Sequence, residues 1–570
     1  MLVDTQYLKN SKKLVVSYVD KSGDIKLKYF DWDNPMKYVT CEDSDPQKHH
    51  KYKSWDGKSV KHVEVNYPDR YAIYEFLDAL PQEEQDEIFE FNFPNIYFID
   101  IETEIVDGFP EAADIYKVNS NGENVLVKEG AATSVLSISI VYEDKIILLG
   151  LRDMSEDMQT RIKTNTNKYF EKFESDYKFK YVKYEDEFDM LYAFFNNMVP
   201  KMSVLTGWNF LNYDWTYLVN RARKLKKNVN GKEYSIDPRV ASLTKRISKK
   251  WGTNFEEPAH RMIFDYMQLY EIADTSIKVK ESSSLDFVSS KLVGIDKIKY
   301  VNSIYKLKED SVIEGFYFKK DDICRKEDDS YYMYLGTDRI DISEEKFKTY
   351  KDLFREVNVS NLQTLYEEDF EIYMYYNAVD SVLVQKIHEA RNYISIIYAI
   401  SSLAKIRIVD VVSQMNNALG SLAITEGVLR NRFRENENIV LFKEGNNDAE
   451  STIAGGWVKD PVVGLNQWCV TYDFASLYPT TQLQFFIAPE NFVGIQDKKD
   501  KTKCTNGREI DFENYVVCIN GAVFEKRMSP TLQMLSDVYS DRKKNKKIMM
   551  AKKEELNEVM LEIKRLESEI

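Results

Sequence analysis

Asn95–Glu102 has the sequence Asn-Ile-Tyr-Phe-Ile-Asp-Ile-Glu, a short apolar run that ends in two acids. Apolar runs of this length, rich in β-branched and aromatic residues, are typical of a buried strand. Residues two apart on a strand point to the same face, so Asp100 and Glu102 project together. Two carboxylates at the end of a buried strand are unfavourable unless something binds them, and Mg²⁺ prefers oxygen ligands of this kind. A pair of acids on a surface strand is the simpler alternative for this motif alone.

Two further acidic motifs follow along the chain. A strand-like run ends at a glycine turn, and Asn209 and Asp214 then precede a helical pattern. An aspartate in this place is also typical of a helix N-cap. The third motif lies in Phe370–Glu389, a strong helical pattern in which Tyr376 and Asp380 are four residues apart and share one face. By itself, this pair is equally typical of a partly buried tyrosine beside a surface acid.

Taken in this order, the three motifs resemble those of the DEDD exonucleases, in the tyrosine form found in family B DNA polymerases of the T-even bacteriophage type. The resemblance implies a ribonuclease-H-like domain that hydrolyses DNA at its 3′ end with two Mg²⁺ ions, for which Mn²⁺ substitutes. Tyr376 would orient the attacking water, and Asn209 would contact the frayed strand. The metal ligands that the resemblance implies are Asp100, Glu102, Asp214 and Asp380.

A fourth motif lies at Val470–Pro479, with the sequence Val-Thr-Tyr-Asp-Phe-Ala-Ser-Leu-Tyr-Pro. It resembles motif A of family B polymerases, whose core is D-x-x-S-L-Y-P. The resemblance implies that Asp473 ends a strand and gives a catalytic carboxylate to the metal ions of a polymerase site. The turn after it, at Ser476 and Leu477, would bind phosphate oxygens through backbone N–H groups. Tyr478 would lie under the sugar ring and exclude a 2′-hydroxyl.

A short element before motif A resembles the Y-x-G-G element that joins exonuclease and palm in this family. Ile453 stands in place of its tyrosine, which puts the hydrogen bond of that tyrosine in doubt. Gly455 and Gly456 match the two glycines, and the resemblance implies that they follow the template backbone.

A basic segment after motif A, Arg542–Lys547, stands where the first fingers helix of the family carries R-K-x-x-K-K. The resemblance implies that these cations hold the incoming triphosphate, arginine through paired hydrogen bonds and lysine as a point charge. Arg542 and Lys546 are four residues apart and share a helix face, so they are the expected contacts. A basic, solvated helix is the alternative.

Together these patterns predict a multidomain α/β protein. Periodicity predicts strands at 14–18 and 25–29, a hairpin of 135–142 with 145–151, and helices at 188–198, 214–224, 285–293 and 537–570. The region near 297–368 is dense in charge and tyrosine with weak periodicity, and we interpret it as an insertion. The resemblance places a β-rich amino-terminal domain at 1–95 that returns at 394–444, the exonuclease domain at 96–393, the start of the palm at 445–528 and a partial first fingers helix at 529–570.

The composition is that of a globular protein, with 43% hydrophobic residues among 570. No apolar run approaches the ~20 residues of a membrane span, and the first ten residues lack the layout of a signal peptide. Five scattered cysteines without a CxxC pair favour free thiols in a reducing compartment. We therefore expect no membrane partner and, on the resemblance, a location in the cytoplasm of a bacterial host.

The net charge of −15 does not exclude a nucleic-acid partner, because net charge describes the whole surface. Basic residues still cluster locally, at 221–232, 245–250 and 542–547. For most such runs the simpler interpretation is a solvated face, so charge alone does not decide the question.

Three later parts of a family B polymerase are not found in the 570 residues: the K-x-x-x-N-S-x-Y-G motif, the D-T-D motif and the thumb. Asp473 is then one of two carboxylates that the polymerase metals require, and its site alone would lose several kcal/mol of charge stabilisation. We expect that the chain does not polymerise DNA by itself. A complementary polypeptide would carry the rest of palm, fingers and thumb, with a sliding clamp reached through that partner.

The expected function is thus the amino-terminal portion of a replicative, phage-type DNA polymerase with a 3′→5′ proofreading exonuclease. Its expected partners are primer-template DNA, single-stranded DNA 3′ ends and dNTP. A DNA-binding scaffold of the replication machinery, with vestigial catalytic residues, is the alternative. The presence of all four exonuclease carboxylates and of Tyr376 favours the enzyme.

Overall fold

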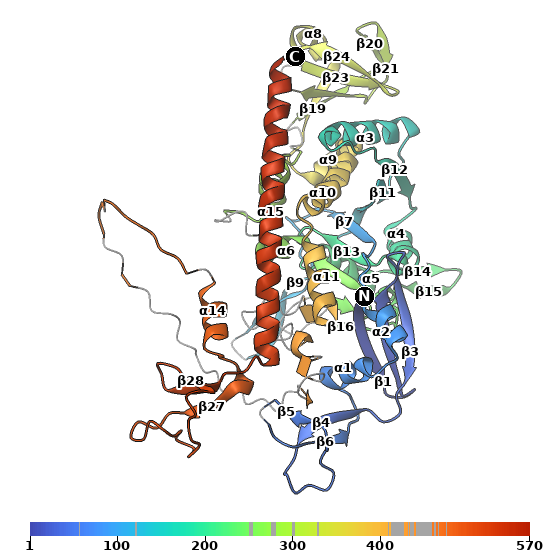
Figure 1. The fold of residues 1–570 in the computed structure, drawn as a ribbon. Coiled ribbons are helices and arrows are strands. Elements are labelled where there is room, and N and C mark those ends of the chain that lie inside the picture. The colour runs from blue at the N-terminus through green and yellow to red at the C-terminus, as the bar shows by residue number, and fades with distance from the viewer. Residues whose placement is uncertain are drawn as a thin grey trace. The chain divides into compact units, whose positions relative to one another are not determined.

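The computed structural model describes residues 1–55, 57–119, 122–249, 255–274, 281–298, 303–327, 330–408, 410–411, 427–430, 432–433, 438–440, 459–460, 463–465, 467–474 and 476–569. The chain forms two compact units. The first comprises Met1–Leu8, Lys13–Asp31 and Pro81–Gly420, and the second comprises Lys9–Lys12, Trp32–Leu80 and Ser421–Ile570. Both units contain helices and strands, so the predicted mixed α/β class is confirmed (Figure 1). The predicted domain boundaries stay predictions.

The first unit is built around a six-stranded sheet, whose strands in spatial order are β12 (Lys178–Lys183), β11 (Lys145–Gly150), β10 (Val135–Tyr142), β7 (Ile96–Thr103), β13 (Val204–Gly207) and β18 (Met262–Asp265). β7 is antiparallel to β10 on one side and parallel to β13 on the other. β11 is antiparallel to β10 and parallel to β12, and β18 is parallel to β13. The predicted acidic strand is therefore an interior strand of a mixed sheet.

The predicted hairpin is formed by β10 and β11. Tyr142 lies opposite Lys145, so Glu143 and Asp144 make a two-residue turn. Glu143 has a φ of 50°, and the two-residue turns that favour hairpins have a positive φ at their first central residue. This local geometry confirms the hairpin that alternation and turn residues predicted.

Helices also form where periodicity predicted them. The predicted helices at 214–224 and 285–293 are α5 (Asp214–Lys224) and α7 (Leu285–Val293), and the third acidic motif lies on α10 (Phe370–Arg391). The predicted helix at 188–198 begins as α4 (Glu187–Ala193) and then continues as a π-helical turn over Phe194–Met198.

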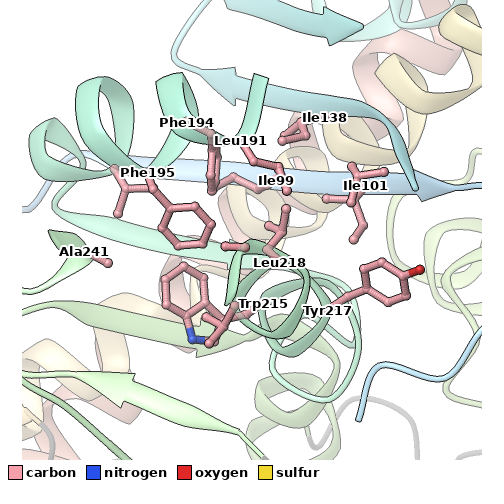
Figure 2. Packing of buried hydrophobic residues seen from close by; sticks show 14 of the residues in the cluster. Ile99, Ile101, Ile138, Leu191, Phe194, Phe195, Trp215, Tyr217, Leu218 and Ala241 are labelled. Carbon is pink, nitrogen blue, oxygen red and sulfur yellow. The ribbon is translucent and has the colours of Figure 1, made fainter. Parts of the chain in front are cut away.

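A hydrophobic core fixes β7 against α4 and α5. Ile99 of β7 lies in one buried cluster with Leu191 of α4 and Trp215 of α5 (Figure 2). Trp215 is fully buried and its indole N–H donates to the backbone oxygen of Glu256 over 2.7 Å, so its polar group is satisfied. Because alternate residues of a strand face opposite sides, a strand that buries Ile99 and Ile101 in this core turns its acids to the other face.

The region interpreted as an insertion contains a second sheet with its own core. Its strands in spatial order are β24 (Asp338–Ser343), β23 (Ser330–Leu335), β22 (Ile323–Glu327), β19 (Ser303–Leu307) and β25 (Phe354–Asn358), and α8 (Glu344–Tyr350) packs on it. Met333 and Phe347 are buried in its core, and the rings of Tyr331 and Phe347 stack 3.6 Å apart. We call residues 303–358 the inserted sheet.

Smaller elements complete the first unit. An antiparallel sheet of β1 (Leu2–Leu8), β2 (Lys13–Val19) and β3 (Ile25–Asp31) contains both predicted amino-terminal strands. Three hairpins are exposed to different degrees: β8 (Ile115–Val118) with β9 (Asn124–Lys128), β14 (Lys226–Val229) with β15 (Lys232–Ser235), and β16 (Ile247–Lys249) with β17 (Glu256–Pro258). Within the inserted sheet's sequence, β20 (Ser311–Ile313) pairs with β21 (Phe316–Phe318). The other helices are α2 (Gln82–Phe89), α3 (Glu156–Tyr169), α6 (Tyr266–Ala273), α9 (Leu362–Glu368) and α11 (Tyr393–Ala404).

The second unit combines segments from distant parts of the sequence. Its elements are α1 (Arg70–Asp78), the pair β4 (Met36–Thr40) and β6 (Val60–Glu64), the pair β5 (Lys53–Ser54) and β26 (Ile439–Val440), α14 (Leu477–Gln484), a sheet of β27 (Phe492–Ile495), β29 (Ala522–Glu525) and β28 (Tyr515–Val517), and α15 (Pro530–Glu569). α15 is 40 residues long and confirms the predicted carboxy-terminal helix. Pro530 stands at its first position, where a missing N–H costs nothing. Among the described residues, no helix combines the length and the apolar character that a membrane span needs.

Candidate active site

The structure brings the first and third acidic motifs together. Asp100 and Glu102 project from β7, and α10 packs on β7 and β10. Ligand oxygens of Asp100, Glu102 and Asp380 all lie within 4.8 Å of one another. Asp380 is 5% exposed and Glu102 is 9% exposed, so the cluster is largely shielded from water. We call these three residues the acidic cluster.

Asp214 lies beside this cluster rather than within it. It is the first residue of α5, is 4% exposed, and accepts a hydrogen bond from the backbone N–H of Ile101 over 3.0 Å. Ile101 stands between the two acids of β7, so the second motif is bonded to the strand that carries the first. The structure thus gathers all four predicted carboxylates around one segment of β7.

The four acids are held in an environment that opposes their ionisation. Burial raises the pKa of Asp100 to about 7 and that of Asp380 to about 6. Burial also raises the pKa of Glu102 and of Asp214 well above their ordinary values, with the charge of Asp100 adding to both shifts. Burial away from water is the main cause of these shifts, and the nearby like charges add to it. A bound cation would lower the pKa values again.

The residues of the site fit a hard divalent cation. Oδ1 of Asp380 is buried, and no group among the described residues donates a hydrogen bond to it. A buried carboxylate oxygen without a donor is unfavourable, and native proteins rarely leave one so. All the candidate ligands are carboxylate oxygens, the donors that Mg²⁺ and Mn²⁺ favour.

Lys297 was not singled out by the sequence, yet it contacts the cluster. Its Nζ lies 2.6 Å from Oδ2 of Asp380 and 4.6 Å from the ring centroid of Tyr376. Burial acts to lower the pKa of Lys297, but the charge of Asp380, together with Tyr376 and the hydrogen bonds to both, outweighs burial and raises that pKa. The backbone N–H of Lys297 donates to Oδ1 of Asp286 on α7 over 2.8 Å. Lys297 lies at the edge of a charged region of weak periodicity, and nothing in the local sequence indicates that it pairs with Asp380.

Two further residues of α10 belong to the site. Tyr376 is 8% exposed and lies one turn before Asp380, as predicted. Burial raises the pKa of Tyr376, so its hydroxyl stays protonated at neutral pH. Asn377, to which the sequence assigned no role, is fully buried; its Nδ2 donates to Oδ2 of Asp100 over 2.8 Å, and its Oδ1 accepts from Ser137 Oγ over 3.2 Å. The buried amide therefore orients one carboxylate of the cluster.

The loop between β13 and α5 is shaped by close packing. A Cβ on Gly207 would lie 2.3 Å from the backbone oxygen of Ile99, so only glycine fits there. Asn209 follows with a φ of 58°, and its Oδ1 accepts from Asn212 Nδ2 over 3.2 Å. Asp265, at the end of β18, accepts the Leu211 N–H over 3.3 Å and caps α6. The loop that leads to Asp214 is thus held from two neighbouring strands.

The predicted polymerase residue Asp473 does not end a strand. It is exposed, and the structure has no strand over 467–474, so that prediction is wrong. A strand is defined by hydrogen bonds to a neighbouring strand, and none of the described sheets includes this segment. Gly455 and Gly456 lie outside the described residues.

The turn after Asp473 meets the basic part of α15. Ser476 has a φ of 54° and precedes α14, and Nη1 of Arg542 donates to its Oγ over 3.5 Å. Tyr539, missed by the sequence, lies beside them, and hydrogen bonds with Lys543 and Ser476 lower its pKa. The remaining predicted nucleotide contacts are exposed on α14 and α15: Leu477, Tyr478 and Lys546.

The basic cluster at 221–232 is mostly neutralised by neighbouring acids. Glu187 pairs with the first cation of α5 over 2.8 Å, with both side chains largely buried. Such a pairing favours the simpler interpretation, a structural or solvated face, over a free surface for phosphates. The cations that each form an ion pair with an acid are Arg221, Arg223, Lys224, Lys226 and Lys227.

Comparisons with known proteins agree with the motifs. A family model described as DNA polymerase family B, exonuclease domain, matches residues 77–288, and one described as DNA polymerase family B matches residues 420–568. Together they match well over half of the chain. The first match ends at residue 288, so it does not include Tyr376 and Asp380 of the third motif. The structure alone places Asp380 beside the acids of β7.

Two curated proteins are similar to this chain. The DNA-directed DNA polymerase of Escherichia phage RB69 is 23% identical over 380 residues, which is 66% of this chain and 34% of that protein. The DNA-directed DNA polymerase of Enterobacteria phage T4 is 23% identical over 384 residues, with the same shares of 66% and 34%. The chain thus spans about a third of the length of these relatives. The ordered acidic motifs, motif A and both family matches show that this chain belongs to the family B DNA polymerases and carries the exonuclease domain of that family.

Proposed function

We propose that the first unit is a 3′→5′ exonuclease of the ribonuclease-H-like kind, which removes nucleotides from DNA ends with two divalent metal ions. The observation that carries this proposal is the acidic cluster, in which β7 and α10 bring ligand oxygens within 4.8 Å of one another. Two-metal hydrolysis of phosphodiesters uses ions about 4 Å apart, held by carboxylates. Asp214, bonded to the same strand, is the fourth proposed ligand. The alternative of a DNA-binding scaffold finds no support in either family match.

The chain's own residues would position the reacting groups. When bound, two Mg²⁺ ions, or Mn²⁺ in their place, lower the pKa of a water and stabilise the leaving 3′ oxygen. Tyr376, protonated at neutral pH, would hold that water through its hydroxyl. Asn377 would keep Asp100 in its orientation through the 2.8 Å hydrogen bond. Lys297 would offset part of the negative charge at Asp380, and Asn209 would contact the frayed strand.

An assay on single-stranded DNA tests this proposal. We expect Mg²⁺-dependent shortening of a 5′-labelled oligonucleotide in single-nucleotide steps, abolished by a chelator. A paired 3′ end should react about tenfold more slowly for each base pair that must fray, because each pair costs about 1.4 kcal/mol and each ~1.4 kcal/mol is tenfold in rate. Release of label from the 5′ end, or equal rates on paired and unpaired ends, would contradict a proofreading exonuclease.

We further propose that the second unit forms part of a polymerase site for primer-template DNA and dNTP. The contact between Arg542 and Ser476 supports it, because it joins the turn of motif A to the cations expected to hold a triphosphate. Asp473 would be the metal ligand, and Tyr478 would select the sugar. The other proposed contacts are Ser476, Leu477, Arg542 and Lys546 for the nucleotide and Gly455 and Gly456 for the template.

Polymerisation would require residues that these 570 do not contain. A two-metal transfer site uses more than one carboxylate, and the D-T-D motif that supplies the other in this family is not found in the sequence. We infer that further polypeptide, in the same or in a separate chain, supplies it together with the returning fingers helix and the thumb. A sliding clamp would act through that part, and the assembly would work in the cytoplasm of a bacterial host, a proposal that the similarity to phage polymerases supports.

Primer extension tests the polymerase proposal. The 570 residues alone should extend a primer at less than about 1% of the rate reached with a polypeptide that carries the missing motifs, because loss of one metal-binding carboxylate removes several kcal/mol. Asp473→Asn in the mixture should abolish extension again. Efficient extension by the 570 residues alone would refute the need for further polypeptide.

A further inference from the structure

The inserted sheet holds the first turn of the helix that carries Tyr376 and Asp380. Arg325 of β22 is 3% exposed and forms a paired interaction with Asp369: its Nε donates to Oδ2 and its Nη2 to Oδ1, each over 2.7 Å. Nη2 also donates to Oε2 of Glu371 over 3.3 Å. Asp369 is the N-cap of α10, and Glu371 lies in its first turn. The sheet therefore bonds directly to the start of this helix.

A second arginine joins the same carboxylates to another part of the fold. Arg161 of α3 donates to both oxygens of Glu371, over 3.0 Å and 2.8 Å, and to the backbone oxygen of Gly336 in the inserted sheet. The ring of Tyr334 lies 4.8 Å from the Arg161 guanidinium and 5.9 Å from that of Arg325. Burial acts to raise the pKa of Glu371, but the two arginines outweigh it and lower that pKa. One buried and one partly buried cation, Arg325 and Arg161, thus face two buried anions.

A third cation extends this contact. Nζ of Lys306 on β19 lies 2.7 Å from Oε2 of Glu368, at the end of α9. The chain segment that enters the sheet also carries Lys297, which pairs with Asp380. Lys297 therefore ties the segment before the sheet to α10, and Lys306 ties the first strand of the sheet to the end of α9, one residue before the N-cap of α10.

We propose that the inserted sheet is a positioning element for the proposed exonuclease, and that Arg325 is its positioning residue. Arg325 is too buried to reach DNA, so it acts through α10. From Glu371 to Asp380 the helix rises about 13 Å, so a tilt of about 5° at its first turn would move Asp380 by about 1 Å. A displacement of ~1 Å in a catalytic group can lower a rate by as much as ~100-fold.

This inference rests on the proposed exonuclease and is tested by a matched set of variants. Arg325→Met with Asp369→Ser removes the paired interaction, keeps an N-cap through serine, and leaves Glu371 bonded to Arg161. Replacing a buried ion pair by uncharged groups need not destabilise the fold. Arg325→Lys keeps the charge but loses the fork of donors. Arg355→Met, in an exposed ion pair of the same sheet, is the control.

The double variant should lower kcat on single-stranded DNA about tenfold. This is less than the ~100-fold limit, because α10 is also held by its packing on β7 and β10 of the six-stranded sheet. KM should stay within about twofold, because Arg325 does not touch DNA. Calorimetric titration with Mn²⁺ in the absence of DNA should show a similar loss of affinity. Arg325→Lys should fall between wild type and the double variant, and Arg355→Met should match wild type.

A folded double variant with wild-type kcat and Mn²⁺ affinity would overturn the inference. If the double variant does not fold, the decision passes to Arg325→Lys, which leaves no buried charge unpaired. Wild-type values for that variant would then refute a positioning role. A wild-type chain that neither binds Mn²⁺ nor degrades DNA would instead refute the proposed exonuclease, so the two failures are distinguishable.

Discussion

Replacing Asp100 by Asn and Glu102 by Gln is expected to lower the 3′→5′ exonuclease rate by at least about 10³-fold, or about 4 kcal/mol at ~1.4 kcal/mol per tenfold. The two acids form the acidic cluster together with Asp380, so their loss removes carboxylates on which both metal ions would depend. The amides keep the shape of the side chains, and an amide oxygen at position 100 can still accept from Asn377. The rate is measured on a single-stranded oligonucleotide with saturating Mg²⁺.

The double variant should fold at least as well as wild type when no metal is present. Burial and neighbouring like charges raise the pKa of both acids, so their charges destabilise the metal-free fold at neutral pH. Thermal unfolding with a chelator should give an equal or higher Tm for the variant. Glu143→Gln, on the exposed turn between β10 and β11, is the matched control and should leave rate and Tm unchanged. Nuclease activity that survives in the well-folded double variant would exclude this cluster as the catalytic site.

The apparent affinity of the first unit for Mn²⁺ is expected to rise at least about tenfold per pH unit between pH 5 and pH 7, the largest effect of solution conditions that we expect. Metal ligands must be deprotonated, and burial raises the pKa of Asp380 to about 6 and of Asp100 to about 7. Protons therefore compete with the metal over this range. Calorimetric titration with Mn²⁺ at several pH values measures it, and an affinity independent of pH would contradict the shared, buried site.

The stability of the metal-free chain should change in the opposite sense. The folded pKa values of Asp100 and Glu102 lie above their unfolded values, so the stability that these acids contribute when protonated is complete below about pH 4 and is lost as the pH rises to 7 and beyond. The Tm of wild type should therefore fall relative to that of the Asp100→Asn, Glu102→Gln variant between pH 5 and pH 8. Added Mn²⁺ should raise the Tm of wild type alone, because the metal binds only the folded site. A constant difference between the two proteins would show that these acids do not titrate as described.

Local patterns in the sequence predicted the elements that carry the site. The bounds of α5 and α7 agree with the periodicity, β7 lies where the apolar run predicted a buried strand, and the β10–β11 hairpin lies where it was predicted. The common face of Asp100 and Glu102 follows from strand geometry alone. These features depend on residues a few positions apart, whose preferences act without the rest of the fold.

Other features could not be inferred locally. Asn377 lies within a motif that the sequence singled out, but its bond to Asp100 appears only when α10 packs on β7. Lys297 and Arg325 lie in a region of weak periodicity. In its strand β23, tyrosines occur on the buried face and on the opposite face, so the sequence does not show which face is buried. The strand expected before Asp473 is absent from the described segment, because strand formation depends on a partner strand and not on local preference.

By itself, the sequence predicted which side chains would carry the proposed chemistry and which strand and helices display them, because motif spacing and periodicity are short-range properties of the chain. Only the tertiary structure decided which of these residues meet. The six-stranded sheet brings Asp214 to the backbone of β7, and α10 brings Asp380 across to the two acids of that strand. The inserted sheet then bonds to the first turn of α10 through Arg325. Contacts of this kind join segments far apart in the chain, so they are set by the packing of whole elements, which no local pattern encodes.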